Sequence, residues 1–505
     1  MKFKAIGSLL LGLALTVTLN VHARPDGDRN DHDRGGDRDH HDQECRISDH
    51  HENDVNTPVK AVGVIVVPGN PIASSDIAWV DSATERYYVA DRSNSGVDII
   101  DAENDTWVGR VGGFLGGFPT TPSNGGGNAM TSNGAGPNGV VVTPDKHLWA
   151  GDGNSLVQVA DVDPSHVPGT YLSNLGTIST LWNNPANLAA DSCDSGTSTT
   201  HFCGRADELA FDPKDHIIFI GNPNALSTAA GHAPIPYGTF ISSDPPYNAL
   251  SVKGHLAFPG AGGLEQPVWD PELQRFIVNV PGLLNTSVTP NTVVTPATIQ
   301  IVNPITMTSE ETFSLDCNTI TGGVTANNTA AGVGITGIAL APFQHILVSA
   351  CGFPIILTLN LKADAIHVLN VVKNVGGGDE VWFNPGDDRY YVTGPLNGVT
   401  GNLQQLGVID AEDGSFLQNV PEILGDPALP PVTTPATPVN LGKNPAAFPE
   451  QNRIFTVGQI SAAIAAGTTP DFSPCAKFNV TKTGCIAVFT HENESEENEH
   501  GHDDH

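Results

Sequence analysis

Carboxylate side chains recur just before short apolar segments of this 505-residue chain. Asp379 starts the segment DEVWFNPGDDRYYVTG (379–394), and Asp207 lies at the start of ADELAFDPKDHIIFIG (206–221). Seven such segments can be aligned on the proline of their turn, or on Arg-Tyr-Tyr where that proline is missing. One column then collects mostly oxygen-bearing side chains: Asp76, Asn138, Asp207, Glu265, Thr336, Asp379 and Lys443. We therefore expect one polar, mainly acidic site assembled from several repeats.

Such a site has the chemistry of a cation-binding centre. Converging carboxylates repel one another unless some are protonated or a cation binds. Hard oxygen ligands suit calcium, which is therefore the expected cofactor. The predicted metal ligands are Asp76, Asn138, Asp207, Glu265 and Asp379. The alternative is a hydrated polar channel in which Lys443 balances part of the charge.

A cation at this site would also permit hydrolysis. It would polarise a substrate and lower the pKa of a bound water, with Asp207 or Asp379 as the candidate catalytic base. The G-x-S-x-G, P-loop and H-E-x-x-H motifs are missing from the sequence. His147, His216 and His345 recur after the short turn, at the opposite end of each repeat, and we interpret them as structural.

The repeats predict the elements that position this column. Each copy reads as an apolar strand, a Pro/Asp/Gly turn and a second strand, and a third and fourth strand follow in most copies. A period of about 45 to 70 residues indicates a repeat architecture. Four antiparallel strands per repeat are typical of a β-propeller blade. The copies cover 75–91, 137–152, 206–221, 265–280, 335–350, 379–394 and 443–458.

The ends of the repeat region predict how the ring closes. The last copy lacks an outer strand, whereas the strand at 59–69 precedes the first copy and has no blade of its own. We therefore predict an all-β fold, a seven-bladed β-propeller over 58–490, closed by an N-terminal strand that joins the C-terminal blade. An open array of β-sandwiches is the alternative.

Connection lengths predict which face of the propeller binds. The turns between first and second strands are short, whereas the connections at the opposite end of the blades are long. The long connections emerge on the same face as the acidic column. Because loops on a rigid scaffold carry most binding residues, we expect the long-loop face to be the functional one.

Two stretches are similar to the repeats of NHL, YVTN and gluconolactonase-type propellers, namely PNGVVVTPDKHLWAGD (137–152) and ERYYVADRSNSGVDIIDAENDTWVGRV (85–111). In gluconolactonase-like enzymes a Glu, an Asn and an Asp at the channel mouth hold a divalent cation, commonly calcium. Asn138 matches the Asn-Gly motif of that family. Asp76 stands where the family has a Glu-Gly-Pro motif, and Glu265 is a partial match in another repeat. The resemblance implies a propeller with a cation site, although those enzymes are typically six-bladed.

The termini predict export. Residues 1–23 combine early lysines, a short apolar run and Val-His-Ala, as in a signal peptide. Residues 24–57 and 491–505 are rich in His, Asp and Glu and nearly free of apolar residues, which predicts disordered segments able to bind transition metals weakly. The net charge of −32 argues against nucleic acid as a partner, and no later segment could cross a membrane.

The seven cysteines suit an oxidising, periplasmic or extracellular compartment. Three disulfides are expected, and Cys45 is left as the odd thiol. The expected pairs are Cys193–Cys203, Cys317–Cys351 and Cys475–Cys485. Together these features predict an exported propeller that binds a protein, a glycan or a small molecule. The alternative is a metal-dependent hydrolase of lactone-like or phosphoester substrates.

Overall fold

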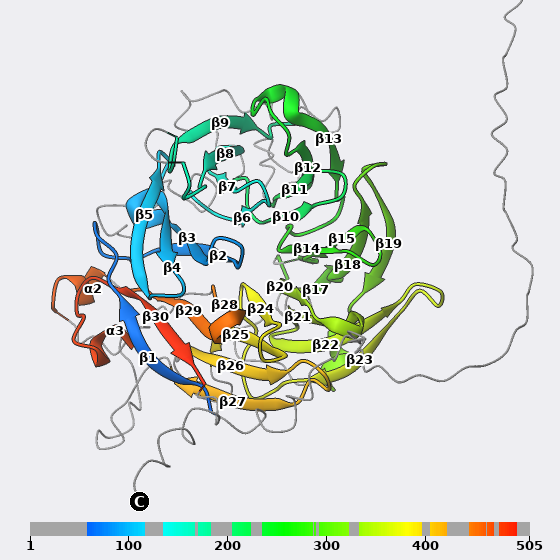
Figure 1. Ribbon diagram of the computed structural model, residues 1–505. Coiled ribbons are helices and arrows are strands. Elements are labelled where there is room, and N and C mark those ends of the chain that lie inside the picture. Colours follow the sequence, from blue (N-terminus) through cyan, green and yellow to red (C-terminus); the bar gives the residue numbers. More distant parts are fainter. Residues whose placement is uncertain are drawn as a thin grey trace, which may run out of the picture. The chain divides into compact units, whose positions relative to one another are not determined.

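Seven four-stranded antiparallel sheets stand around a common axis, as in a seven-bladed β-propeller (Figure 1). The expected fold class is therefore confirmed. The structure is a computed structural model that describes residues 58–116, 135–166, 170–182, 205–223, 235–285, 287–288, 292–322, 333–395, 404–421, 444–460, 462–468 and 474–491. All of them belong to the unit Asn53–His505. Cys45, Cys193, Cys203, Lys443 and residues 24–57 and 492–505 lie outside the described residues.

Strands that follow one another along the chain form blades 1 to 6, and the chain runs through each blade from the innermost strand outward. Blade 1 contains β2 (Ser75–Asp81), β3 (Arg86–Asp91), β4 (Gly96–Asp101) and β5 (Thr106–Gly112). Blade 2 contains β6 (Val140–Val142), β7 (His147–Asp152), β8 (Leu156–Asp161) and β9 (Asn174–Ser179). Blade 3 contains β10 (Leu209–Asp212), β11 (Ile217–Asn222), β12 (Tyr237–Ser242) and β13 (Val252–Ala257).

The next three blades repeat this order, with one hairpin inserted in blade 4. Blade 4 contains β14 (Pro267–Asp270), β15 (Arg275–Val280), β18 (Thr298–Asn303) and β19 (Thr308–Ser314), and its hairpin is β16 (Leu283–Asn285) with β17 (Thr292–Thr295). Blade 5 contains β20 (Ile335–Leu340), β21 (Ile346–Ala350), β22 (Phe353–Asn360) and β23 (Ala365–Val371). Blade 6 contains β24 (Val381–Asn384), β25 (Arg389–Pro395), β26 (Gln404–Asp410) and β27 (Phe416–Pro421).

Blade 7 joins the two ends of the repeat region. It contains β28 (Ala446–Phe448), β29 (Arg453–Gly458), β30 (Cys485–Thr490) and, as its outer strand, β1 (Lys60–Ile65). Strand β1 pairs antiparallel with β30, so that Ala61 lies opposite Phe489. The strand expected to have no blade of its own is therefore the outer strand of the last blade. The edge of β30 is covered by this pairing, which removes an open sheet edge.

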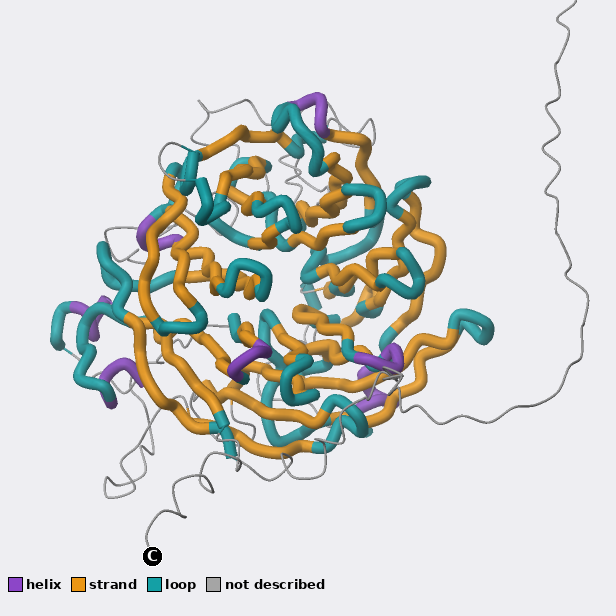
Figure 2. Tube along the Cα trace, viewed as in Figure 1, coloured by secondary structure: helices purple, strands orange, loops and turns teal. Residues whose placement is uncertain are grey.

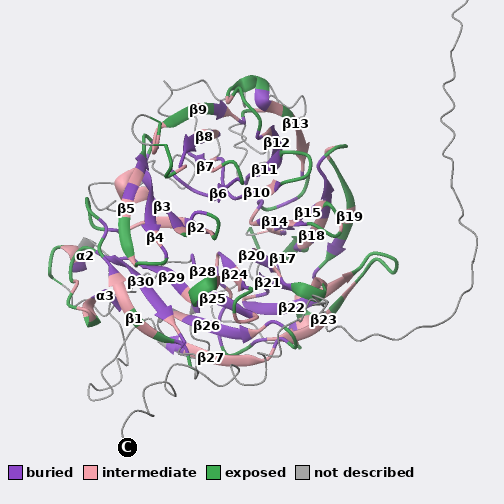
Figure 3. Cartoon of the chain, in the orientation of Figure 1, coloured by how far each residue is buried: buried purple, intermediate pink, exposed green. Residues whose placement is uncertain are grey.

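Apolar packing between blades holds the ring together. The innermost strand of every blade contacts the innermost strands of both neighbours. Tyr87 of blade 1 stacks on Phe455 of blade 7 at 5.0 Å between ring centroids, and Phe219 of blade 3 stacks on Phe276 of blade 4 at 5.4 Å. Middle strands are covered on both faces, so β11 is buried throughout, whereas the outer strand β9 is mostly exposed (Figure 3).

Long connections on one face contain the short α-helices and the two disulfides of the described part of the chain. Helix α1 (Cys317–Thr321) lies between β19 and β20, and α2 (Ala462–Ala465) and α3 (Pro474–Lys477) lie between β29 and β30 (Figure 2). The expected Cys317–Cys351 and Cys475–Cys485 bonds are both present. No helix in the described part of the chain is long and apolar enough to span a membrane.

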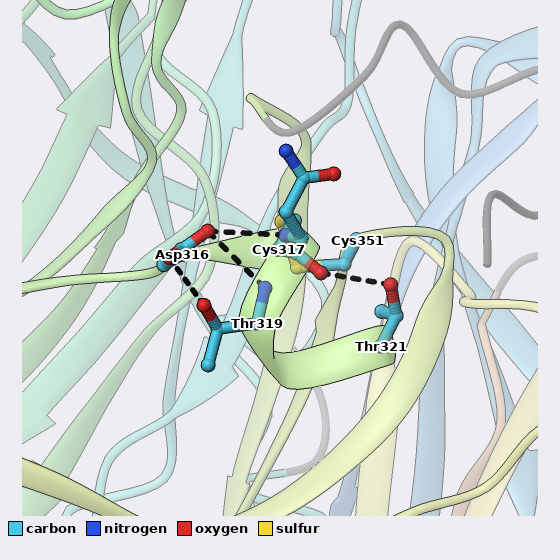
Figure 4. The surroundings of a disulfide bond; sticks show 6 residues. Asp316, Cys317, Thr319, Thr321 and Cys351 are labelled. Atoms are coloured by element: carbon cyan, nitrogen blue, oxygen red, sulfur yellow. Dashed lines mark hydrogen bonds between the residues drawn. A yellow bond between two sulfur atoms is a disulfide. The ribbon is translucent and has the colours of Figure 1, made fainter. Parts of the chain in front are cut away.

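The Cys317–Cys351 bond fixes helix α1 against the turn between β21 and β22 (Figure 4). Asp316 caps the helix, since its Oδ1 accepts hydrogen bonds from the backbone N–H groups of Asn318 at 3.1 Å and Thr319 at 3.3 Å. The Thr319 hydroxyl donates to Oδ2 of Asp316 at 2.6 Å. This part of the long-loop face is therefore held by a covalent link and a capped helix.

Candidate functional site

The described members of the predicted column lie at the N-terminal ends of the inner strands, on the long-loop face. In blades 2, 3 and 4, backbone hydrogen bonds show that the column members occupy equivalent positions. The N–H groups of Asn138, Asp207 and Glu265 each donate to a carbonyl near the end of the second strand of the same blade, at 2.8, 2.9 and 3.1 Å respectively. The alignment made from sequence is therefore correct in these three blades.

Asp76 and Asn138 are bound by a shared arginine. Arg92 begins the short 3-10 helix η3 (Arg92–Asn94), whose N-cap Asp91 accepts from the backbone N–H of Asn94 at 3.1 Å. The Arg92 guanidinium donates to Oδ2 of Asp76 and, through Nη2 at 2.6 Å, to Oδ1 of Asn138. Burial raises the pKa of Asp76 to about 6, although the charge of Arg92 opposes the rise. The oxygen of Asn138 that a metal would need is thus already bound by a cation.

Asp207 forms the second arginine pair of the site. Its Oδ2 lies 2.6 Å from Nη2 of Arg205, and both side chains are largely buried. Arg205 also interacts electrostatically with Asp76 and Glu265, which belong to other blades. A buried ion pair of this kind is costly to break, because removal of either partner leaves an uncompensated charge.

Glu208 is a buried acid that follows the predicted column by one residue. It is 4% exposed, and its Oε2 has no hydrogen-bond partner among the described residues. Burial raises its pKa well above the usual value, and the charges of Glu265 and Asp207 raise it further. Asp379 and Asp76 interact with it as well. Glu208 therefore interacts electrostatically with carboxylates from four blades.

Glu380 is the second buried acid at this position. Its side chain is fully buried, and its Oε2 accepts a hydrogen bond from the backbone N–H of Ala78 at 2.9 Å. Its Oε1 has no hydrogen-bond partner in the described part of the chain. Burial raises the pKa of Glu380 well above its usual value, and the charges of Asp76 and Asp379 contribute to this rise.

These acids form one electrostatic group across blades 1, 3, 4 and 6. We call this group the acidic mouth, which consists of Asp76, Asp207, Glu208, Glu265, Asp379 and Glu380. No three Asp, Glu, His or Cys side chains in the described ranges lie close enough together to hold a metal ion. The calcium site with Asp76, Asn138, Asp207, Glu265 and Asp379 as ligands stays a prediction.

Other polar side chains at these strand ends join neighbouring blades. Nδ2 of Asn138 donates to the carbonyl of Ala206 in the next blade at 2.8 Å. The hydroxyl of Thr336 donates to Ser349 at 3.0 Å and also to the carbonyl of Gly378, which precedes blade 6. The predicted column therefore mixes two roles, acids of the mouth and amide or hydroxyl links between blades.

Arg92, Arg205, Glu208 and Glu380 are not among the site residues predicted from the sequence. Lys and Arg together number only 23, against 55 Asp and Glu. Because basic residues are this rare, an arginine close in sequence to a column acid indicates an ion pair. Arg205 is two residues from Asp207, and the two glutamates directly follow column members. Arg92 lies sixteen positions from Asp76 and could not have been paired with it without the fold.

The recurring histidines lie at the other end of the blades, on the face with the short turns. Nδ1 of His147 lies 2.8 Å from the Tyr247 hydroxyl, and Nδ1 of His345 lies 3.0 Å from the carbonyl oxygen of Ala411. His216 pairs with Asp244 at 2.9 Å. These contacts join turns of the same or adjacent blades, which agrees with a structural role.

Comparisons with known proteins do not place the chain in a family. No family model matches it, and no curated protein matches it. A chain in a crystal structure of the mitotic checkpoint complex is similar with a TM-score of 0.47 and 12% identity, covering 86% of this chain and 96% of that chain. The Cps50 (Swd1) β-propeller domain of Myceliophteria thermophila is similar with a TM-score of 0.49 and 9% identity, covering 86% and 99%. The propeller fold itself follows from the strand order.

Proposed function

We propose that this chain is an exported β-propeller that binds a positively charged ligand on its long-loop face, at the acidic mouth. One observation carries the proposal. Six carboxyl groups from four blades interact with one another there, and in the described part of the chain Arg92 and Arg205 interact with Asp76, Asp207 and Glu265. A site with excess negative charge, formed where a rigid scaffold presents its longest loops, attracts and retains cations.

Export is supported by the signal-peptide-like residues 1–23 and by the two disulfides. Disulfides persist in oxidising compartments, which favours a periplasmic or extracellular location. The disulfides also restrain connections on the long-loop face, so part of the binding surface is preorganised.

The residues of the mouth favour binding over hydrolysis. A hydrolase would need a carboxylate free to act as a general base. Asp207, one of the two predicted bases, forms an ion pair with Arg205 at 2.6 Å and is therefore not free to act as one. Deeper in the ring, Trp79 of β2 packs edge to face against Trp382 of β24, at 5.4 Å between ring centroids. Aromatic side chains below an acidic mouth suit recognition of a ligand more than activation of water.

Thermal unfolding of the full chain tests the proposal. Calcium chloride, magnesium chloride and a polyamine would each be compared with sodium chloride at equal ionic strength, after treatment with chelator. A cation that binds the folded state at about a hundredfold excess over Kd stabilises it by about 2.7 kcal/mol. We expect at least one cation to raise the melting temperature of the wild type and of the control Glu272→Gln, on the short-turn face, but not of Asp379→Asn. Equal melting in every salt would overturn the proposal.

A further inference from the structure

We infer that the ligand of the acidic mouth is a flexible cation that carries two or more ammonium groups along an alkyl chain, as in a polyamine or a lysine-rich segment. This inference rests on the proposed function and names the chemistry of its ligand. It is based on three features of the mouth, namely how its charge is distributed, what its buried oxygens lack and which apolar side chains lie nearby.

The negative charge is spread around the ring axis. Glu208 interacts electrostatically with Asp207 in its own blade and with Glu265, Asp379 and Asp76 in three others. Within the described residues, no three of these groups converge as metal ligands would. Calcium takes six to eight oxygens at about 2.3–2.6 Å, which requires convergence on one point. Several separated carboxylates match a ligand whose own charges are separated.

The buried carboxylates need hydrogen-bond donors. Oε2 of Glu208 and Oε1 of Glu380 are buried without a hydrogen-bond partner in the described part of the chain. The two arginines of the mouth bond to other members, Arg92 to Asp76 and Asn138, and Arg205 to Asp207. An ammonium group brings three N–H donors together with its charge. It would supply the donors that these two oxygens lack, and its charge would favour the ionised form of both glutamates.

Apolar surface near the mouth suits an alkyl chain. Trp79 and Trp382 are partly buried members of β2, which contains Asp76, and of β24, which begins just after Asp379. Methylene groups can pack against such rings, and an ammonium is attracted to an aromatic face.

Isothermal titration of the full chain at neutral pH and fixed ionic strength tests the inference. The probes are spermine, tetralysine, butylamine and calcium chloride. We expect spermine or tetralysine to bind with one site per chain, at least about tenfold more tightly than butylamine or calcium. Comparison of spermine with tetralysine separates a free polyamine from a lysine-rich segment as the source of the ammonium groups.

Variants locate the binding. Glu208→Gln and Glu380→Gln keep the side-chain shape and remove one charge each, so each should weaken spermine binding about tenfold. The control Glu272→Gln should bind spermine as the wild type does. Unchanged spermine binding in both mouth variants would overturn the inference.

The remaining outcomes separate the inference from the proposed function. Tight calcium binding without spermine or tetralysine binding would overturn the inference and leave the proposed function standing. Binding of none of the four probes would overturn both.

Discussion

The two ends of the inner strand of blade 3 show carboxylates in opposite situations. At the short-turn end, Oδ1 of Asp212 accepts hydrogen bonds from the backbone N–H groups of Lys214 at 2.9 Å and Asp215 at 3.2 Å. At the mouth end, Oδ2 of Asp207 faces Arg205, and Glu208 has a buried oxygen with no hydrogen-bond partner among the described residues. The same residue types therefore accept backbone hydrogen bonds of a turn at one end and lie among carboxylates of other blades at the other.

The contrast recurs in blade 4. Oδ1 of Asp270 accepts from the backbone N–H groups of Glu272 at 2.8 Å and Leu273 at 3.0 Å. Aspartate favours such turns because its side chain replaces a missing backbone acceptor. A buried acid that lies among other carboxylates destabilises the fold when it ionises. Burial alone therefore does not distinguish the two strand ends, whereas the carboxylates of other blades around Glu208 and Glu380 do.

The largest expected effect is at the short-turn end. Asp270→Ala removes the acceptor of two backbone N–H groups at a buried position, so the free energy of unfolding should fall by about 1–3 kcal/mol. Asp270→Asn keeps a carbonyl acceptor and should lose much less. Urea unfolding of both variants measures the difference. Equal losses in the two would mean that the charge of Asp270, and not its turn, stabilises the blade.

A change of opposite sign is expected at the mouth end. Glu208→Gln removes a buried charge, so the free energy of unfolding at neutral pH should rise by on the order of 1 kcal/mol. The same urea titration measures it, with Glu272→Gln as an exposed control that should stay within about 0.5 kcal/mol of the wild type. A destabilised Glu208→Gln protein would mean that Glu208 is stabilised by its surroundings, and the contrast between the strand ends would fail.

Sequence reasoning predicted the blades because their physics is local. Strand alternation, turn residues such as Pro213 and the spacing of the copies all lie within short windows of the chain. The unpaired strand around Ala61 could be assigned because the last blade visibly lacked one, and its pairing with Phe489 follows from that. The disulfides at Cys317 and Cys475 followed from the compartment and the spacing of the cysteines.

The site could be predicted only in part, because its contacts join distant positions. A column of acids is visible in the repeats, but the arginine that binds Asp76 comes from the end of another strand. The hydrogen bond from Asn138 to the carbonyl of Ala206 depends on how blades 2 and 3 pack together. Burial of Glu208 and Glu380 depends on all the neighbouring strands, so no local pattern distinguishes them from exposed acids.

A further expected effect concerns pH, because acids at the two ends of the blades should titrate in different pH ranges. Burial raises the pKa of Asp76 to about 6, and it also raises that of Glu208 and Glu380 in the folded state. A raised folded-state pKa gives stability that is fully present below the unfolded value, near 4, and is lost as the pH rises through the folded value. At the short-turn end, hydrogen bonds with Ser165 lower the pKa of Asp163 to about 2, and bonds with His147 and Thr143 outweigh burial to lower that of Asp145.

These lowered values give stability that is present above the unfolded pKa and is lost on acidification. The chain should therefore be more stable near pH 5 than at pH 7, and should lose stability below about pH 4. Between about pH 5 and 7, each mouth acid changes the free energy of unfolding by at most about 1.4 kcal/mol per pH unit. Glu208→Gln should reduce the loss of stability between pH 5 and 7 and leave the loss below pH 4 unchanged, whereas Asp145→Asn should reduce only the loss below pH 4. Urea midpoints across this pH range measure both losses. If Glu208→Gln changes the loss below pH 4 instead, the assignment of the two pH ranges to the two strand ends is wrong.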